Sequence, residues 1–202
     1  MILITLNQYI KENLNKDLIF VDIQPEYQDY FNFTSQWIYF LNNNYLNYNI
    51  TLLYNGQELG MITEGEYVMW LFENGLEEDA LNYIEFYDKG YAFFRYCIDN
   101  GIDDDLTVNL IKFMISEGIT DSRDIDEGTW DKFISKHDDS QEIRELLEHS
   151  SDLIYIPYLM DLLKNNSNIT LAGGGIDECL REVEIALKAL NKKYDLMDSF
   201  IY

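Results

Sequence analysis

Short apolar runs alternate along the chain with segments of helical periodicity. The runs are LIFVD (18–22), ITLLY (50–54), YIEFY (83–87), LIYI (153–156), ITLAG (169–173) and YDLMDSFIY (194–202). Most of them have the length of a buried strand, and the segments between them are long enough to hold crossover helices. The alternation predicts an α/β protein with a three-layer, Rossmann-like, mostly parallel sheet.

Helix signals divide the remaining sequence. A first helix is expected over 6–14 and a second from Thr34 or Ser35 to Leu41. Thr63 and Glu66 have the spacing of a capping box and predict a helix that stops at Gly75.

The middle of the chain carries an almost wholly helical pattern over about 91–149. In DDLTVNLIKFMISEG the apolar side chains recur at the three-and-four spacing of an amphipathic helix. Only two prolines and no Gly/Ser tract are present to mark a linker. We therefore expect one α/β domain over 1–202, with 60–150 as a largely helical insertion or cap.

The net charge of the chain limits the kinds of partner that it is expected to bind. Fourteen basic and 37 acidic residues give a formal net charge of −23. Binding to nucleic acid by phosphate neutralisation needs clustered Lys and Arg, so this mode is not expected. The acidic surface fits solubility best, and it also leaves room for a basic protein partner or a homo-oligomer.

Other compositional signals point to a cytoplasmic protein. The sequence has no apolar run long enough for a membrane span and no secretory signal at its start. Cys97 and Cys179 do not form a disulfide framework, and no Cys/His cluster indicates zinc. No motif names a cofactor or a metal.

Candidate chemistry falls where strands give way to helices, because ligands of parallel α/β sheets bind outside the carboxyl ends of the strands. Asp22 ends the first apolar run and suits a general base, a metal ligand or a turn cap. Asp88 precedes Lys89 and Gly90 at the end of the third run. It would face Asp22 if the two strands were neighbours, and an ordinary turn explains the same residues.

The stretch ITLAGGGIDECLREVEIAL places three glycines and a cysteine at a strand-to-helix turn. Gly173, Gly174 and Gly175 allow left-handed backbone and close approach of a ligand. Cys179 would lie in the first helical turn, where the helix dipole favours a nucleophilic thiolate, while the neighbouring acids oppose it. A tight corner with a small buried cysteine is the simpler alternative.

These residues resemble those of the isochorismatase-like hydrolases, which include the nicotinamidases. In that family the first strand ends in an Asp followed by a Gln, as in VDIQPEY here, and a Cys follows a strand-end glycine by six residues, as Cys179 follows Gly173. The resemblance implies that Asp22 is the general base, Cys179 the nucleophile, and Gln24 part of a small-molecule site. The family's Lys is expected shortly before the last helix, where LLEHSSDLIYIP holds none and Lys136 is the nearest upstream.

Several other interpretations compete with this one. The glycine turn is also similar to the nucleotide turn of the lysine-decarboxylase-like (LOG) proteins, and the whole chain to uncharacterised proteins of large tailed phages. A PIN-type nuclease would use Asp22 with Asp88, Asp121 or Asp124 to hold Mg²⁺. A phage-type inhibitor or ligand-sequestering protein would keep the site without turnover, which would account for the missing Lys.

Overall fold

The protein contains a five-stranded, all-parallel sheet whose strands alternate with helices along the chain, which confirms the predicted α/β Rossmann-like fold. The computed structural model describes residues 16–56, 62–89, 97–119, 126–136 and 157–202, with the backbone alone at 157 and 158. The strands are β1 (Asp17–Val21), β2 (Asn49–Tyr54), β3 (Ile84–Asp88), β4 (Ile169–Gly173) and β5 (Tyr194–Leu196). The expected helix over 6–14 and strand over 153–156 lie outside the described residues.

The strands are ordered β3-β2-β1-β4-β5, so the chain first builds outward on one side of β1 and then on the other. In the register, Val21 of β1 lies beside Leu53 of β2 and Gly173 of β4. Every residue of β1 is buried, as expected for a central strand of a parallel sheet covered on both faces. The residues that directly follow these three strands are therefore brought together.

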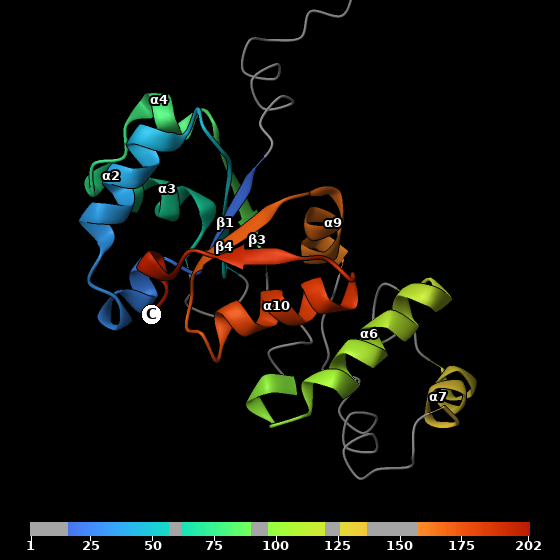
Figure 1. Ribbon diagram of the computed structural model, residues 1–202. Helices are drawn as coiled ribbons and strands as arrows, with labels where there is room; N and C mark the ends of the chain where they lie inside the picture. The colour runs from blue at the N-terminus through green and yellow to red at the C-terminus, as the bar shows by residue number, and fades with distance from the viewer. Residues whose placement is uncertain (1–15, 57–61, 90–96, 120–125, 137–156) are drawn as a thin grey trace, which may run out of the picture. The chain divides into compact units, whose positions relative to one another are not determined.

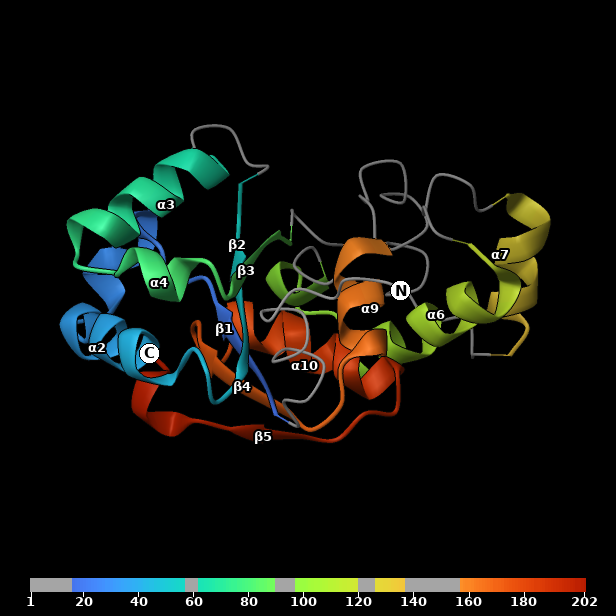
Figure 2. The same ribbon diagram turned by 90° about the horizontal axis from the view of Figure 1, so that it is seen from above.

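One face of the sheet is covered by three helices that follow β1 and β2 in the sequence. They are α2 (Thr34–Asn44), α3 (Glu64–Glu73) and α4 (Glu78–Leu81), and Figures 1 and 2 show them together on one side of the strands. Their apolar faces bury Trp37, Leu41 and Leu71 completely. Phe20 of β1 meets Trp37 edge to face, with ring centroids 5.7 Å apart. This aromatic core fixes the strand that precedes Asp22.

Two predicted helix starts have different outcomes. At α3 both hydrogen bonds of the predicted capping box are present, between Thr63 and Glu66. The helix that was to be capped by Thr34 or Ser35 instead has Phe33 at its N-cap, with no side-chain cap, and continues to Asn44. Phe33 packs against Phe31, with ring centroids 5.1 Å apart. An aromatic residue therefore occupies the N-cap position, one residue before Thr34.

The last predicted strand is shorter than expected. YDLMDSFIY forms β5 only as far as Leu196 and then turns through a 3-10 helix, η4 (Asp198–Phe200). The turn buries Phe200 against Phe20 and Phe40 at centroid distances of 5.9 and 5.5 Å. Burial of this ring outweighs continuation of the strand, and the turn returns Tyr202 to the end of β1.

The chain divides into two compact units. The first holds residues 1–90, 166–180 and 193–202, and the second holds 91–165 and 181–192. The described helices of the second unit are α6 (Asp104–Glu117), α7 (Glu127–Ile134), α9 (Pro157–Asn165) and the larger part of α10 (Cys179–Ala189). The helix predicted in DDLTVNLIKFMISEG is α6, and it buries Leu110, Phe113 and Met114 as the spacing indicated.

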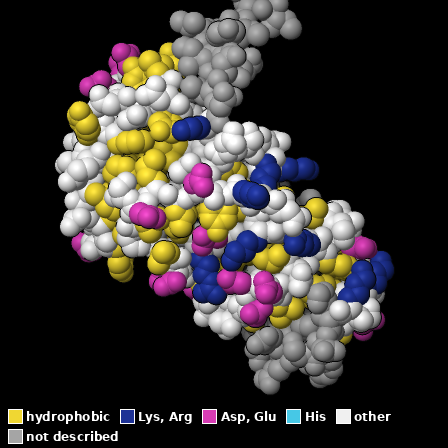
Figure 3. Space-filling model, in the orientation of Figure 1, with side chains coloured by type: hydrophobic (Ala, Val, Ile, Leu, Met, Phe, Trp, Pro, Cys, Tyr) yellow, Lys and Arg dark blue, Asp and Glu magenta, His cyan; other side chains and the backbone are white. Residues whose placement is uncertain are grey.

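Apolar side chains also reach the surface of the first unit. Figure 3 shows them gathered over the region of the first helices. The exposed large apolar side chains of the first unit include Tyr30, Tyr39, Leu46, Met69, Phe72, Ile176 and Leu196. Within the described parts of the chain, no helix has the length and apolar character needed to cross a membrane.

Replacing Gly173 with Ala is expected to lower the free energy of unfolding by about 2–4 kcal/mol. Gly173 has φ +77°, and a Cβ atom there would collide with the backbone oxygen of Val21. Gly65 in α3 is the matched control, because a Cβ at that position meets nothing within 4 Å. Urea unfolding should show Gly65→Ala neutral or stabilised by up to about 1 kcal/mol. Equal effects of the two substitutions would contradict the close packing of β4 on β1.

Candidate functional site

Asp22 occupies the position where ligands bind in open parallel sheets. The chain leaves β1 on one side for β2 and returns on the other side as β4, so the end of β1 is the topological switch point. Asp22 follows β1 directly, is 0% exposed, and adopts a left-handed backbone with φ +50°. A buried, non-glycine residue in this conformation is typical of functional sites, where the surrounding structure maintains local strain.

Lys89 forms a buried ion pair with Asp22. Its Nζ lies 2.7 Å from Asp22 Oδ2, and the two side chains are 3% and 0% exposed. Lys89 directly follows β3, and its backbone N–H donates to the Tyr54 carbonyl at the end of β2. The ammonium thus reaches the carboxylate from two strands away, supplying the countercharge that a buried carboxylate needs.

Sequence reasoning did not assign Lys89 to this site. The Lys of the resembled family was expected near the last helix, and Lys89 was interpreted as part of a turn. The usable signal was a Lys immediately after an apolar run that ends at the same sheet edge as Asp22. Sequence alone does not order the strands, so the pairing could not be assigned before the topology was known.

Asp88 does not face Asp22 across neighbouring strands, because β2 lies between β1 and β3. Its Oδ1 instead accepts a hydrogen bond from the Gly56 backbone N–H at 3.1 Å. This contact ties the segment after β2 to the end of β3, which corresponds to the turn-forming alternative for Asp88. Asp121 and Asp124, the other acids of the nuclease hypothesis, lie outside the described residues.

The glycine turn brings Cys179 to the end of β4. Gly173 and Gly174 both have positive φ, +77° and +66°. A Cβ atom on Gly174 would lie 3.4 Å from the Cys179 Cβ and 3.0 Å from the Leu180 backbone nitrogen, so the turn packs directly against the start of α10. Cys179 is the first residue of that helix and is 6% exposed. Gly175 continues the turn, and its carbonyl accepts hydrogen bonds from Glu178 and Leu180.

The pKa values of two tyrosines are affected by the acidic groups of the site. The pKa of Tyr27 is raised to about 12, first by burial and then by the charges of Asp22 and Cys179, with Lys89 acting in the opposite direction. The pKa of Tyr202 is raised by burial and by the same two acidic groups. Both phenols therefore lie within electrostatic reach of the carboxylate, the thiol and the ammonium, and both remain protonated at neutral pH.

Tyr202 also connects the two sides of the site. Its hydroxyl donates to the backbone carbonyl of Asp22 at 2.9 Å. Its backbone N–H donates to Gly174 at 3.2 Å, and its carbonyl accepts from Ile176 at 3.2 Å. The left-handed Asp22 and the glycine turn are thus held by one residue.

The side chain of Gln24 hydrogen-bonds the backbone of the residue that follows the neighbouring strand, β2. It is 0% exposed, and its Oε1 accepts from the Asn55 backbone N–H at 2.9 Å. Its Nε2 donates to the Asn55 carbonyl at 3.3 Å and to Glu26 at 3.1 Å. These contacts fix the residue that follows β2, so Gln24 is placed to act through Asn55.

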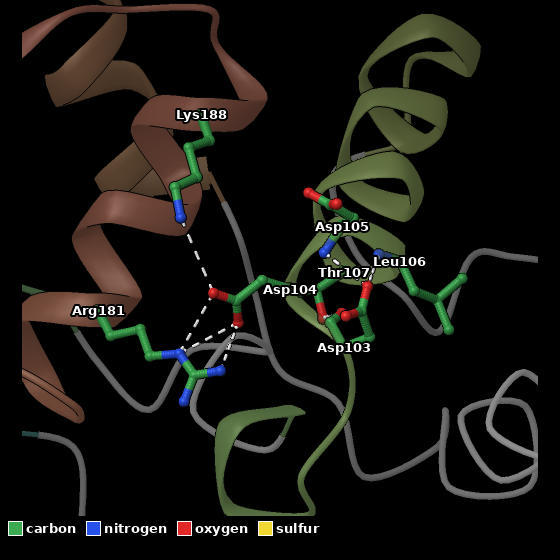
Figure 4. Close-up of polar contacts among 7 residues, drawn as sticks. All are labelled: Asp103, Asp104, Asp105, Leu106, Thr107, Arg181 and Lys188. Atoms are coloured by element: carbon green, nitrogen blue, oxygen red, sulfur yellow. Dashed lines mark hydrogen bonds and ion pairs between the residues drawn. The ribbon is translucent and has the colours of Figure 1, made fainter.

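A second charged cluster lies in the other unit of the chain. Arg181 of α10 donates to both carboxylate oxygens of Asp104 at 2.7–3.3 Å, and Lys188 lies 3.8 Å from the same carboxylate (Figure 4). Asp103 caps the first turn of α6 beside it. The Asp104 carboxylate is shared by two cationic side chains, and all three side chains are partly exposed. This arrangement is typical of a contact between two helices.

The residues present do not favour a metal centre. Among the described residues no three His, Cys, Asp or Glu side chains gather in the geometry of a metal site. The Asp22 carboxylate already faces an ammonium, whose positive charge would repel a divalent cation.

Comparison with known proteins adds no relative. No protein-family model, no curated protein and no solved structure matches the chain. The geometry of the site is therefore the basis for the proposed function.

Proposed function

We propose that the protein is a cysteine-dependent hydrolase of small amides, diverged from the isochorismatase-like hydrolases, with Asp22, Lys89 and Cys179 as its catalytic residues. One observation carries the proposal: the 2.7 Å contact between Lys89 Nζ and Asp22 Oδ2, buried in the site that also holds Cys179. The contact supplies a Lys that the sequence did not assign to the resemblance.

Asp22 and Cys179 can divide the steps of amide hydrolysis between them, while Lys89 balances the charge of Asp22. Asp22 takes the thiol proton of Cys179, and the thiolate attacks the amide carbonyl carbon to form a tetrahedral adduct. The adduct collapses as the carbon–nitrogen bond breaks, and the nitrogen leaves as ammonia with the proton returned by Asp22. Water then attacks the thioester carbon and gives a proton to Asp22, and the carbon–sulfur bond breaks to release the carboxylic acid. Asp22 returns its proton to the Cys179 sulfur, which restores the thiol and the carboxylate.

The positions of the other groups suit this chemistry. Lys89 balances the charge of the Asp22 carboxylate in a region that water does not reach. The pair therefore carries no net charge before Asp22 accepts the thiol proton. The dipole at the start of α10 favours negative charge at Cys179 and at an oxyanion beside it. The rigid turn at Gly173 and Gly174 keeps the nucleophile close to the end of β1.

The competing hypotheses fit the site less well. The non-catalytic interpretation was motivated by a missing Lys, and Lys89 now offers a candidate for that residue. The nuclease interpretation needs carboxylates open to a metal, whereas Asp22 faces Lys89 and Asp88 accepts from Gly56. These contacts favour the hydrolase over both alternatives.

The test is ammonia release from a panel of primary carboxamides, namely acetamide, propionamide, benzamide and nicotinamide, with intact-protein mass spectrometry of the quenched reaction. The proposal expects turnover of at least one amide and an acyl adduct that maps to Cys179. Chelator should leave the rate unchanged. No ammonia from any amide, or an adduct on Cys97 alone, would contradict the proposal.

A further inference from the structure

Three buried side-chain oxygens in the site have no hydrogen bond among the described residues, and one of them, Asp22 Oδ2, has the Lys89 ammonium at 2.7 Å. The other two are Oδ1 of Asp22, whose residue is 0% exposed, and Oδ1 of Asn55, whose residue is 6% exposed. Buried acceptors in folded proteins are nearly always paired, because an unmatched one loses its hydration without compensation. Two such oxygens at one sheet edge indicate a ligand that brings donors.

Asn55 is held in a defined orientation. It follows β2, and Gln24 clamps its backbone N–H and carbonyl. The side chain of Asn55 also hydrogen-bonds the phenol of Tyr27, a contact that lowers the pKa of that tyrosine. A contact that favours the phenolate is one in which the amide N–H donates to the phenol oxygen. The amide oxygen of Asn55, Oδ1, is then the atom left without a donor.

The two acceptors belong to the same site. Asp22 and Asn55 follow neighbouring strands, and the Asp22 backbone N–H donates to Leu53 at 2.9 Å. Gln24, two residues after Asp22, bridges to Asn55 directly. The backbone N–H of Tyr27 donates to the Gln24 carbonyl at 3.1 Å, so Tyr27, Gln24 and Asn55 belong to one cluster at the end of β1.

We propose that Asn55 is a specificity-determining residue whose Oδ1, together with Asp22 Oδ1, receives the two N–H groups of a substrate's primary amide. This inference rests on the proposed hydrolase and assigns its leaving group. An NH₂ group offers two donors to two acceptors, whereas an ester oxygen offers none and a carboxylate product meets only like partial charges. The two acceptor oxygens therefore favour binding of an amide over an ester, and they weaken binding of the carboxylate product.

The experiment compares kcat/KM for an amide with that for the matching methyl ester, in wild type and in Asn55→Leu, which has a similar shape without the acceptor. The amide is the best substrate of the carboxamide panel. We expect Asn55→Leu to lose about 10- to 100-fold on the amide, the worth of one hydrogen bond in a buried site, and less than about threefold on the ester. Equal losses on both substrates would show a merely structural role and overturn the proposal.

Two further variants guard against a folding defect. Asn47→Leu is the matched control, since Asn47 is exposed and its side-chain amide donates to Asn44 on the protein surface. It should leave the amide-to-ester ratio unchanged. Tyr27→Phe keeps Asn55 but removes the phenol that orients it, and it should lower the ratio in the same direction as Asn55→Leu. An unchanged ratio in Tyr27→Phe, if Asn55→Leu fails to fold, would overturn the proposal.

A binding arm separates this inference from the proposed function. If wild type hydrolyses neither amide nor ester, the hydrolase fails, and calorimetric Kd values for acetamide and methyl acetate decide the rest. Tighter binding of acetamide by about tenfold or more, lost in Asn55→Leu, would support the acceptor pair in a non-catalytic site. No preference for acetamide would overturn it.

Discussion

Replacement of Cys179 with Ala should reduce amide hydrolysis by about three to six orders of magnitude, because loss of a covalent nucleophile removes the reaction path and leaves only binding and oxyanion stabilisation. Ala is smaller than Cys and compatible with the first turn of α10. The melting temperature should therefore move by only a few degrees. Ammonia release under saturating amide, with circular dichroism as the check on folding, measures both quantities.

Cys97 provides the matched control. It is 0% exposed, and burial raises the pKa of its thiol to about 12, with a side-chain hydrogen bond to Thr107 acting in the opposite direction. It therefore stays a thiol at neutral pH and cannot act as the nucleophile. Cys97→Ala should keep the wild-type rate per folded molecule. A Cys179→Ala protein that is still active would rule out the covalent mechanism.

Replacement of Lys89 with Met should lower the free energy of unfolding by about 3–5 kcal/mol, since it leaves the Asp22 carboxylate buried without its countercharge. Met retains the length and apolar volume of the Lys stem, so the change isolates the ammonium. Urea unfolding at neutral pH gives the stability, and the rate of amide hydrolysis below the unfolding transition should fall as well.

The contrast with an exposed pair makes this prediction specific. Lys132 lies 3.2 Å from Glu117, but these side chains are 60% and 33% exposed. Lys132→Met should cost less than about 1 kcal/mol. The double variant of Lys89→Met with Asp22→Asn should recover much of the lost stability, because it removes both charges together. A small effect of Lys89→Met with no recovery in the double variant would mean that the ion pair does not form.

The hydrophobic pattern was sufficient to predict the sheet. Strands β1 to β4 lie within a residue of their predicted positions, because each coincides with a short apolar run that turn residues bound. The pattern failed at 194–202, where burial of Phe200 required a turn. Nothing in a nine-residue apolar run distinguishes a strand from a strand followed by such a turn.

The site was predicted only in part. Asp22, Gln24, Gly173 and Cys179 could be identified because they directly follow strands or occupy a glycine turn, and these are local features of the sequence. Lys89 and Asn55 are brought to the end of β1 by strand order and register, which are relations between distant segments. Their positions depend on β2 lying between β1 and β3, and no local pattern encodes that order.

The hydroxyl of Tyr202 and the carbonyl of Asp22 are joined across 180 positions of the sequence. Contacts of such separation form late in folding, because closing a long loop costs chain entropy before any contact compensates for it. Pairing of β1 with β4 already places Val21 beside Gly173, so the Tyr202 contacts add a second tie at the same sheet edge. Until β5 and the turn after it have docked, the left-handed backbone of Asp22 lacks this second tie to the glycine turn.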